Sequence, residues 1–122
     1  MSLVLDAGAL IDIERRGEHT LALMELARRE GEAVIVPATV LAQVWRGGPQ
    51  ALLSRALRAG TTVVPLDEHA ARAVGALLSL TGTSDVVDAH VALLARHHEA
   101  AIVTSDPDDL RRLDPRANLH VL

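Results

Sequence analysis

The chain has 122 residues and a formal net charge of −4, and hydrophobic residues make up 49% of it, which fits one globular domain with a single core. Cysteine and lysine are absent, which excludes disulfides, thiolate chemistry and a P-loop phosphate site, since that site needs its lysine. The acidic balance also disfavours tight non-specific binding of nucleic acid.

Apolar runs alternate with helical patterns along the whole chain. Strands are predicted at Leu3–Leu5, Ala33–Val36, Thr62–Pro65, Ala101–Thr104 and Leu119–Leu122. Helices are predicted at Ala9–Glu14, Thr20–Arg29, Ala38–Arg46, Gln50–Arg58, Glu68–Leu80, Val86–His98 and Asp108–Leu113. Pro37, Pro49 and Pro107 fall where helices should begin.

This alternation predicts a single domain, residues 1–122, with a three-layer α/β/α fold and a central parallel sheet of about five strands. The strand segments are continuous apolar runs, which indicates burial on both faces. Two connections, 9–29 and 38–58, each hold two helices, which is more than a simple crossover needs. They favour a helical hairpin or a protruding arm beside the sheet.

Neither a membrane span nor a secretion signal is apparent in the sequence. No apolar run reaches the roughly 18 residues that cross a bilayer. The N-terminus lacks a basic region, and Asp6 interrupts its apolar segment. We therefore expect a soluble, cytoplasmic protein with no membrane partner.

Three aspartates carry most of the chemical signal. Asp6 follows the first strand directly, and Asp106 follows the fourth strand after one residue. Asp88 lies on an amphipathic helix between them in sequence. Carboxylates beyond the carboxyl ends of buried strands lie where open α/β sheets place their active sites. An acidic cluster there repels itself, so it predicts a divalent cation, Mg²⁺ or Mn²⁺.

Each of these acids also has a purely structural interpretation. Asp106 before Pro107 is typical of a helix N-cap, and Asp85 is typical of a cap for the helix that carries Asp88. Asp6 before Ala7 is a weaker cap candidate. Asp88 is harder to explain by capping, because it borders an apolar stripe where a carboxylate needs a partner.

Four segments together resemble one protein family, the PIN domain, and within it the VapC-type toxin ribonucleases of toxin–antitoxin pairs. The order and spacing of the segments carry the resemblance, and they extend over nearly the whole chain. The segments are Leu3–Ile11, Val36–Gly48, Asp88–Ala92 and Ile102–Asp106.

The resemblance implies a Mg²⁺-dependent or Mn²⁺-dependent endoribonuclease in a homodimer, with RNA as substrate and an antitoxin protein as partner. The first acid of the family falls on Asp6, the third on Asp88 and the fourth on Asp106, with Asp85 as a further metal ligand and Asp109 as an auxiliary. Thr104 matches a hydroxyl often found before the last acid. We expect Thr104, Arg46 and Arg15 to contact the substrate.

One position departs from the family pattern. The family usually has a glutamate after the second strand, and this chain has Gln43. Glutamine offers a carbonyl oxygen but no negative charge. Asp12 and Glu14 are the substitutes nearest in sequence to the first acid, but both are expected to face solvent. The departure leaves three interpretations open: a working nuclease, a slow one, or a catalytically inactive PIN-fold binding protein.

Several other residues remain open between two interpretations. His90 is expected to be a packing or surface residue, and Trp45, the only aromatic residue of the Phe, Tyr and Trp class, suits either an interface or the core. The apolar residues at 21–27 and 52–57 are candidate grooves for the antitoxin, or ordinary core. A small-molecule phosphohydrolase is disfavoured, because Asp6-Ala7-Gly8 lacks a paired second aspartate.

Overall fold

The computed structural model describes residues 1–48 and 50–122; Pro49, which we expected at a helix start, lies outside the described residues. The strands are β1 (Leu3–Leu5), β2 (Val34–Pro37), β3 (Thr61–Val64), β4 (Ala101–Thr104) and β5 (Leu119–Val121). The helices are α1 (Ala7–Glu14), α2 (Glu18–Arg29), α3 (Ala38–Val44), α4 (Ala51–Arg58), α5 (Glu68–Thr81), α6 (Val86–His97) and α7 (Pro107–Leu113).

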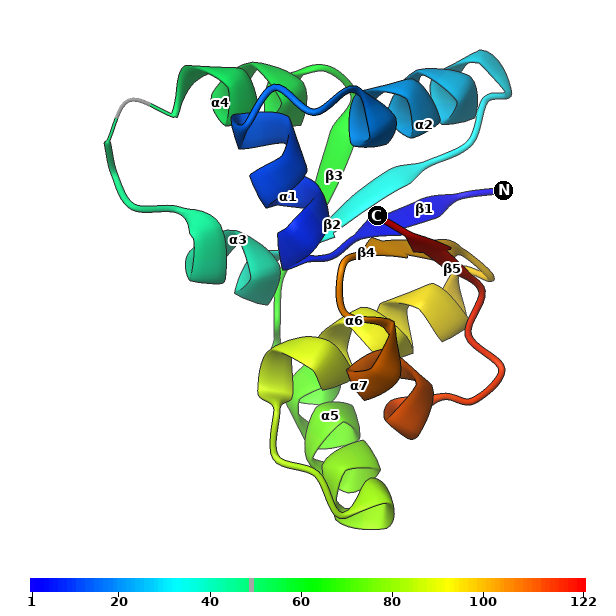
Figure 1. The fold of residues 1–122 in the computed structure, drawn as a ribbon. Coiled ribbons are helices and arrows are strands. Elements are labelled where there is room, and N and C mark those ends of the chain that lie inside the picture. Colours follow the sequence, from blue (N-terminus) through cyan, green and yellow to red (C-terminus); the bar gives the residue numbers. More distant parts are fainter. Residues whose placement is uncertain (49) are drawn as a thin grey trace.

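The five strands form one parallel sheet in the order β3-β2-β1-β4-β5 (Figure 1). In this register Leu5 lies opposite Val103, so Asp6 and Thr104 follow at the same level. The expected adjacency of the first and fourth strands is therefore confirmed. Their carboxyl ends point to one edge of the sheet, which we call the carboxyl edge.

Helices cover both faces of the sheet, so the predicted three-layer arrangement is confirmed. Helices α1, α2 and α4 pack on one side, and α5, α6 and α7 pack on the other (Figure 1). Helix α3 begins at the carboxyl end of β2 and contacts both α1 and α6. Three helices, α1, α3 and α6, thus surround the carboxyl edge.

Burial is greatest in the middle of the sheet. Every residue of β1, β2 and β4 is buried, and aliphatic side chains from α1, α2, α4 and α6 complete the main core. Our expectation that all strands are buried on both faces is wrong for β3 and β5. These are the two edge strands, so each lacks a neighbour on one side.

The two long connections differ in shape. Helices α1 and α2 pack against each other as a hairpin. Helix α3 instead projects from the sheet beside α1 and α6, and α4 lies apart from it, packed against α1 and β3 (Figure 1). The first connection therefore takes the expected form of a hairpin, and the second takes the expected form of an arm.

Two carboxylates on α1 serve as caps for other helices. Asp12 Oδ2 accepts the backbone N–H of Thr20 in α2 at 3.0 Å, and Glu14 Oε1 accepts that of Leu53 in α4 at 3.1 Å. Both side chains are half-buried. Our expectation that they face solvent is therefore wrong, because α2 and α4 present unpaired backbone donors to them.

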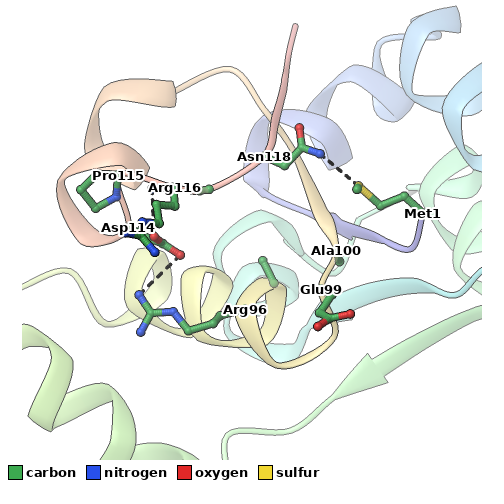
Figure 2. A pocket seen from close by; sticks show the side chains of 10 residues that line it. Met1, Arg96, Glu99, Ala100, Asp114, Pro115, Arg116 and Asn118 are labelled. Atoms are coloured by element: carbon green, nitrogen blue, oxygen red, sulfur yellow. Dashed lines mark hydrogen bonds and ion pairs between the residues drawn. The ribbon is translucent and has the colours of Figure 1, made fainter.

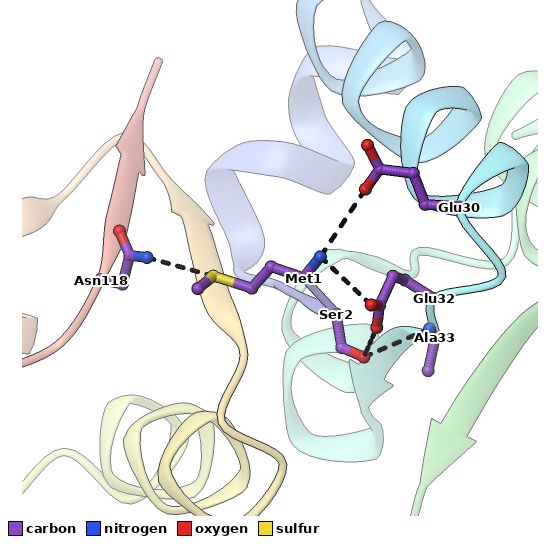
Figure 3. A network of polar contacts seen from close by, with 6 residues as sticks. All are labelled: Met1, Ser2, Glu30, Glu32, Ala33 and Asn118. Atoms are coloured by element: carbon purple, nitrogen blue, oxygen red, sulfur yellow. Dashed lines mark hydrogen bonds and ion pairs between the residues drawn. The ribbon is translucent and has the colours of Figure 1, made fainter.

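The amino end of the sheet is fixed by polar contacts of the first two residues (Figure 3). The terminal ammonium lies 3.7 Å from Glu30 and 3.4 Å from Glu32. Ser2 Oγ donates to Glu32 at 3.0 Å and accepts the N–H of Ala33 at 3.3 Å. These contacts hold β1 beside β2 at the edge opposite the aspartates.

Within the described ranges, no single helix is long and apolar enough to cross a membrane; α5 and α6 together pass by length and composition, but they meet at a bend of 105°.

Gly8, in the first turn of α1, allows this helix to approach the segment after β4. A Cβ added at Gly8 would lie 2.2 Å from Ser105 Oγ and 2.8 Å from the Ser105 backbone nitrogen. Both distances are too short for any side chain. The close contact between residues 8 and 105 thus holds the start of α1 against the end of β4.

We predict that Gly8→Ala lowers the free energy of unfolding by about 1–3 kcal/mol, because the added methyl group overpacks this contact. The matched control is Gly75→Ala on exposed α5, where an added Cβ meets nothing within 4 Å. The free energy of unfolding of that variant should rise by about 0.5–1 kcal/mol, because alanine has a higher helix propensity than glycine. Urea denaturation measures both, and an unchanged midpoint for Gly8→Ala would contradict the close approach.

Candidate functional site

Asp6 is buried at the carboxyl end of β1, with 5% of its surface exposed. Its Oδ1 accepts the N–H of Ala7 at 2.8 Å, and its Oδ2 accepts the hydroxyl of Thr104 at 2.8 Å. The capping interpretation is correct as far as it goes, because Asp6 is the N-cap of α1. Each oxygen still has a lone pair for a further donor or a cation.

Thr104 joins the first acid to the segment that carries the last one. Its side chain is fully buried, and the same Oγ1 that donates to Asp6 accepts the N–H of Asp106 at 2.9 Å. We expected Thr104 among the residues that contact substrate. The structure instead engages its hydroxyl between the two acids, where it fixes their relative positions.

Asp106 precedes α7 but makes no side-chain capping bond, although Pro107 occupies the first turn as predicted. Capping therefore does not explain this acid. Its exposed carboxyl group interacts with Asp109, and a hydrogen bond between the two raises the pKa of Asp106 above its ordinary value. Burial and the charges of Asp109 and Asp6 act in the same direction. Sequence reasoning gave Asp109 only an auxiliary place, although its i+3 spacing from Asp106 indicates this contact.

Asp85 and Asp88 form the third part of the site. Asp85 is the N-cap of α6, and its Oδ1 accepts the N–H of Asp88 at 2.9 Å, as the capping interpretation predicts. Asp88 is half-buried on the first turn of α6. Its side chain is not used for capping, so it remains available for other interactions.

Electrostatics show that these acids act on one another. The pKa of Asp88 is raised from 3.8 to about 7, first by burial and then by the charges of Asp85, Asp6, Asp109 and Asp106. Burial also raises the pKa of Asp6, against the opposite effects of its hydrogen bonds from Ala7 and Thr104. The carboxyl edge is therefore a concentrated negative site that favours protons or cations.

The donor chemistry of this cluster suits Mg²⁺ or Mn²⁺, which prefer carboxylate oxygens. Within residues 1–48 and 50–122, however, no three acidic or histidine side chains converge closely enough to hold a metal ion as they stand. Burial and then the charges of the neighbouring acids raise the pKa of Asp88, so its carboxylate lacks a balancing positive charge. Binding a cation would require the acids to draw together.

In the part of the chain that the structure describes, no hydrogen bond joins the remaining predicted site residues to the acidic cluster. Gln43 is exposed on α3, and no hydrogen bond within the described ranges joins its side chain to an acid. Arg15 is exposed at the end of α1. The Arg46 guanidinium donates to the carbonyl of Trp45 at 2.9 Å and to that of Ala42 at 3.5 Å, so it neutralises the end of α3.

His90 lies on a buried side of α6, and the packing interpretation is correct. Its Nδ1 is hydrogen-bonded to Thr39 Oγ1 of α3 at 2.8 Å, and burial lowers the pKa of its imidazole. This bond ties α3 to the helix that bears Asp88. Sequence reasoning missed it, because the partners are 51 residues apart.

A hollow of about 830 Å³ lies at the opposite, amino edge of the sheet, and Figure 2 shows its lining. Met1, Ala100 and Asn118 line it just before β1, β4 and β5. Two of its charged residues form an ion pair, with Arg96 lying 3.4 Å from Asp114. The hollow is separated from the acids by the length of the strands, so its size does not make it the active site.

A family model for the PIN domain matches residues 3–115, which is nearly the whole chain. The chain belongs to the PIN domain family. No curated protein matches the sequence.

Solved structures share the fold of this PIN domain at low sequence identity. VapBC2 from Rickettsia felis, bound to a DNA fragment from its promoter, has a TM-score of 0.73 and 16% identity, covering 100% of this chain and 99% of the other. FitAB bound to an IR36 DNA fragment has a TM-score of 0.66 and 17% identity, covering 98% of this chain and 94% of the other. FitAcB from Neisseria gonorrhoeae has a TM-score of 0.61 and 18% identity, covering 96% of this chain and 95% of the other.

We predict that Asp88→Asn stabilises the metal-free protein above neutral pH. The folded pKa of Asp88, about 7, exceeds its ordinary 3.8. The folded state therefore holds a proton that the unfolded state has released, and stability falls as pH rises between these values. Asparagine cannot ionise, so the variant escapes this loss.

The expected gain is about 1 kcal/mol at a pH near 8, reduced by solvent screening because the side chain is half exposed. Near pH 4 the variant and the wild type should match. Thermal denaturation in EDTA across this range measures the effect. Added Mn²⁺ should then raise the melting temperature of the wild type more than that of the variant. A gain independent of pH would contradict the electrostatic cause.

Proposed function

We propose that this PIN domain is a Mg²⁺-dependent endoribonuclease, the toxin of a VapBC-like toxin–antitoxin pair. The observation that carries the proposal is the group of acids at the carboxyl edge, where burial and then the charges of the neighbouring acids raise the pKa of Asp88 to about 7. The family match supports nuclease chemistry, because PIN domains are generally nucleases.

In this proposal Asp6, Asp88 and Asp106 hold Mg²⁺ or Mn²⁺, with Asp85 as a further ligand. The bound metal supplies an acidified water and offsets charge on the scissile phosphate. The chain supplies position. Thr104 orients Asp6 and Asp106 by two hydrogen bonds, and the Ala7 N–H fixes the second oxygen of Asp6. These donors hold the first acid in place before any cation arrives.

Gln43 supports a second candidate function, that of a catalytically inactive PIN-fold binding protein. The neutral amide adds no charge to the cluster, and Asp12 and Glu14 do not replace it because they cap α2 and α4. The acids beside Asp88 come instead from β1, α6 and α7. We favour the nuclease, since Thr104 links Asp6 to the segment that carries Asp106, and the charges of these acids reach Asp88 without a carboxylate from α3.

We predict that the purified protein cleaves RNA with Mg²⁺ or Mn²⁺ and loses this activity in EDTA. Asp6→Asn should lower the cleavage rate about a hundredfold or more, since it weakens metal binding and the placement of charge. The matched control is Asp114→Asn at the amino edge, which should keep full activity. Gel-based cleavage of a panel of single-stranded and structured RNAs measures all three.

Gln43→Glu separates the two candidate functions. If the wild type cleaves RNA, the added carboxylate should tighten Mn²⁺ binding and alter the rate only modestly. Activity that appears only in Gln43→Glu would establish the inactive binding protein. Cleavage that is equal in wild type and Asp6→Asn would remove the acidic site from the chemistry altogether.

We further propose that an antitoxin binds the exposed apolar surface of α1, α2 and α4. Leu21 and Leu26 are exposed on α2, and Leu21 lines a hollow of about 450 Å³ together with Leu52 and three arginines. Met24, Ala27 and Leu53 belong to the core instead, so the predicted grooves are only partly surface. The homodimer also remains a proposal, which light scattering of the purified protein tests.

We predict that the protein co-purifies with the product of a neighbouring reading frame. Leu21→Arg should weaken this complex, because it replaces an exposed apolar contact in the hollow with a further positive charge. Leu80→Arg is the control, since Leu80 is 85% exposed at the far end of α5. Pull-down of the tagged partner measures both variants. A complex that tolerates Leu21→Arg as well as Leu80→Arg would place the partner elsewhere.

A further inference from the structure

A groove between α3 and α4 contains Trp45, the only tryptophan in a chain without phenylalanine or tyrosine. Two adjoining hollows of about 470 and 460 Å³ share Trp45, Ser54 and Arg58 in their lining. We call this feature the α3–α4 groove. The indole is 40% exposed, so the core interpretation of Trp45 is wrong and its ring is accessible from solvent.

The backbone on both sides of Trp45 is held in place. Gln50 Nε2 donates to the carbonyl of Val44 at 3.2 Å, and Gln50 Oε1 accepts the N–H of Arg46 at 2.8 Å. The backbone N–H of Trp45 donates to the carbonyl oxygen of Leu41 at 2.8 Å. The exposed indole therefore projects from a fixed backbone, so its placement for a ligand needs little ordering on binding.

The arginines show a division that points to a polyanion. Six of them lie close to a carboxylate: Arg28, Arg29, Arg72, Arg96, Arg111 and Arg112. Within the described ranges no carboxylate pairs with the other six, Arg15, Arg16, Arg46, Arg55, Arg58 and Arg116. Two of these six, Arg55 and Arg58 on α4, line the groove.

One end of the groove lies at the same edge of the sheet as the acidic cluster, because Ala38, the first residue of α3, is part of its lining. Helix α3 follows β2 at the level of Asp6, because Val4 is opposite Ile35 in the sheet. Trp45 ends this helix, about 10 Å from its start at 1.5 Å per residue. A strand of RNA whose phosphate reaches the acids can therefore place a neighbouring nucleotide in the groove.

We propose that the α3–α4 groove binds single-stranded RNA, with one base stacked on Trp45 and its phosphates on Arg58 and Arg55. This inference rests on the proposed ribonuclease function and names where its substrate is held. Stacking on an aromatic ring and pairing of arginine with phosphate are the two interactions that single strands use most. One aromatic ring accommodates one base, so the groove anchors a strand and does not read a sequence.

Trp45 itself reports the test, because with no tyrosine or second tryptophan the intrinsic emission of the protein arises from this residue. An oligoadenylate of about ten nucleotides is titrated into the wild-type protein in EDTA, so that binding is measured without cleavage. Saturable quenching of the emission is expected. A matched abasic strand keeps the phosphates but has no bases, and it should bind more weakly without quenching.

Fluorescence anisotropy of labelled oligoadenylate compares the variants. Trp45→Leu should lower affinity about tenfold through lost stacking. Arg58→Gln should reduce the slope of log affinity against log salt by about 0.7, the value for one phosphate contact on a single strand. The matched control is Arg116→Gln, which changes an equally exposed and unpaired arginine near the amino edge and should bind as the wild type does. Circular dichroism verifies the fold of each variant.

Two results would overturn the inference. The first is binding of oligoadenylate with unchanged Trp45 emission and equal affinity in Trp45→Leu. The second is quenching by the neighbouring-frame protein but not by RNA, which would make the groove a protein-binding surface. Neither depends on catalysis. If RNA cleavage requires Asp6 but Trp45 has no role in binding, the proposed groove is wrong and the proposed nuclease is supported. If RNA quenches the Trp45 emission but is not cleaved, the nuclease is wrong and the groove is supported.

Discussion

The burial of the Asp6 carboxylate is the constraint on which the rest of the site depends. A buried carboxylate needs compensating donors, and Asp6 has two, the Ala7 N–H and the Thr104 hydroxyl. The first requires α1 to begin immediately after β1, and the second requires β4 to lie beside β1. Thr104 in turn fixes the backbone of Asp106. The pairing of β1 with β4, the start of α1 and the position of Asp106 are therefore all linked to the hydrogen bonds of one buried side chain.

The neutral Gln43 makes the site electrostatically asymmetric. The charges that raise the pKa of Asp88 come from Asp85 on its own helix, from Asp106 and Asp109 at α7, and from Asp6. None comes from α3, which begins at the same edge of the sheet. Helix α3 instead ends in Trp45 and Arg46, and its carbonyls are neutralised by the Arg46 guanidinium. The negative charge is thus concentrated toward α6 and α7, and the α3 side is neutral to positive.

The sequence predicts those parts of the structure that depend on local pattern or on the rules of parallel sheets. Asp6 and Asp106 lie at the same edge of the sheet because adjacent parallel strands end there. Asp85 caps α6 because an N-cap aspartate accepts the backbone N–H three residues further along the same helix. The roles of Asp12 and Glu14 depend on where α2 and α4 dock, which no local pattern encodes. The bond between Thr39 and His90 and the exposure of Trp45 depend on the packing of α3 in the same way.

The distribution of arginine gives the asymmetry a consequence for any polyanion that approaches. The chain carries a net charge of −4, so a nucleic acid is repelled by the molecule as a whole and most strongly by the acidic cluster. Arginines that pair with carboxylates contribute little field beyond their own ion pair. The unpaired arginines of α1, α3 and α4 are the ones whose field extends into solvent. In the proposed nuclease, a strand would therefore meet attraction on the α3–α4 side first, and its phosphates would reach the acids only where a bound cation offsets their charge. Binding on arginine would then be separated in space from chemistry at the acids, which would allow an acidic protein to act on an acidic substrate.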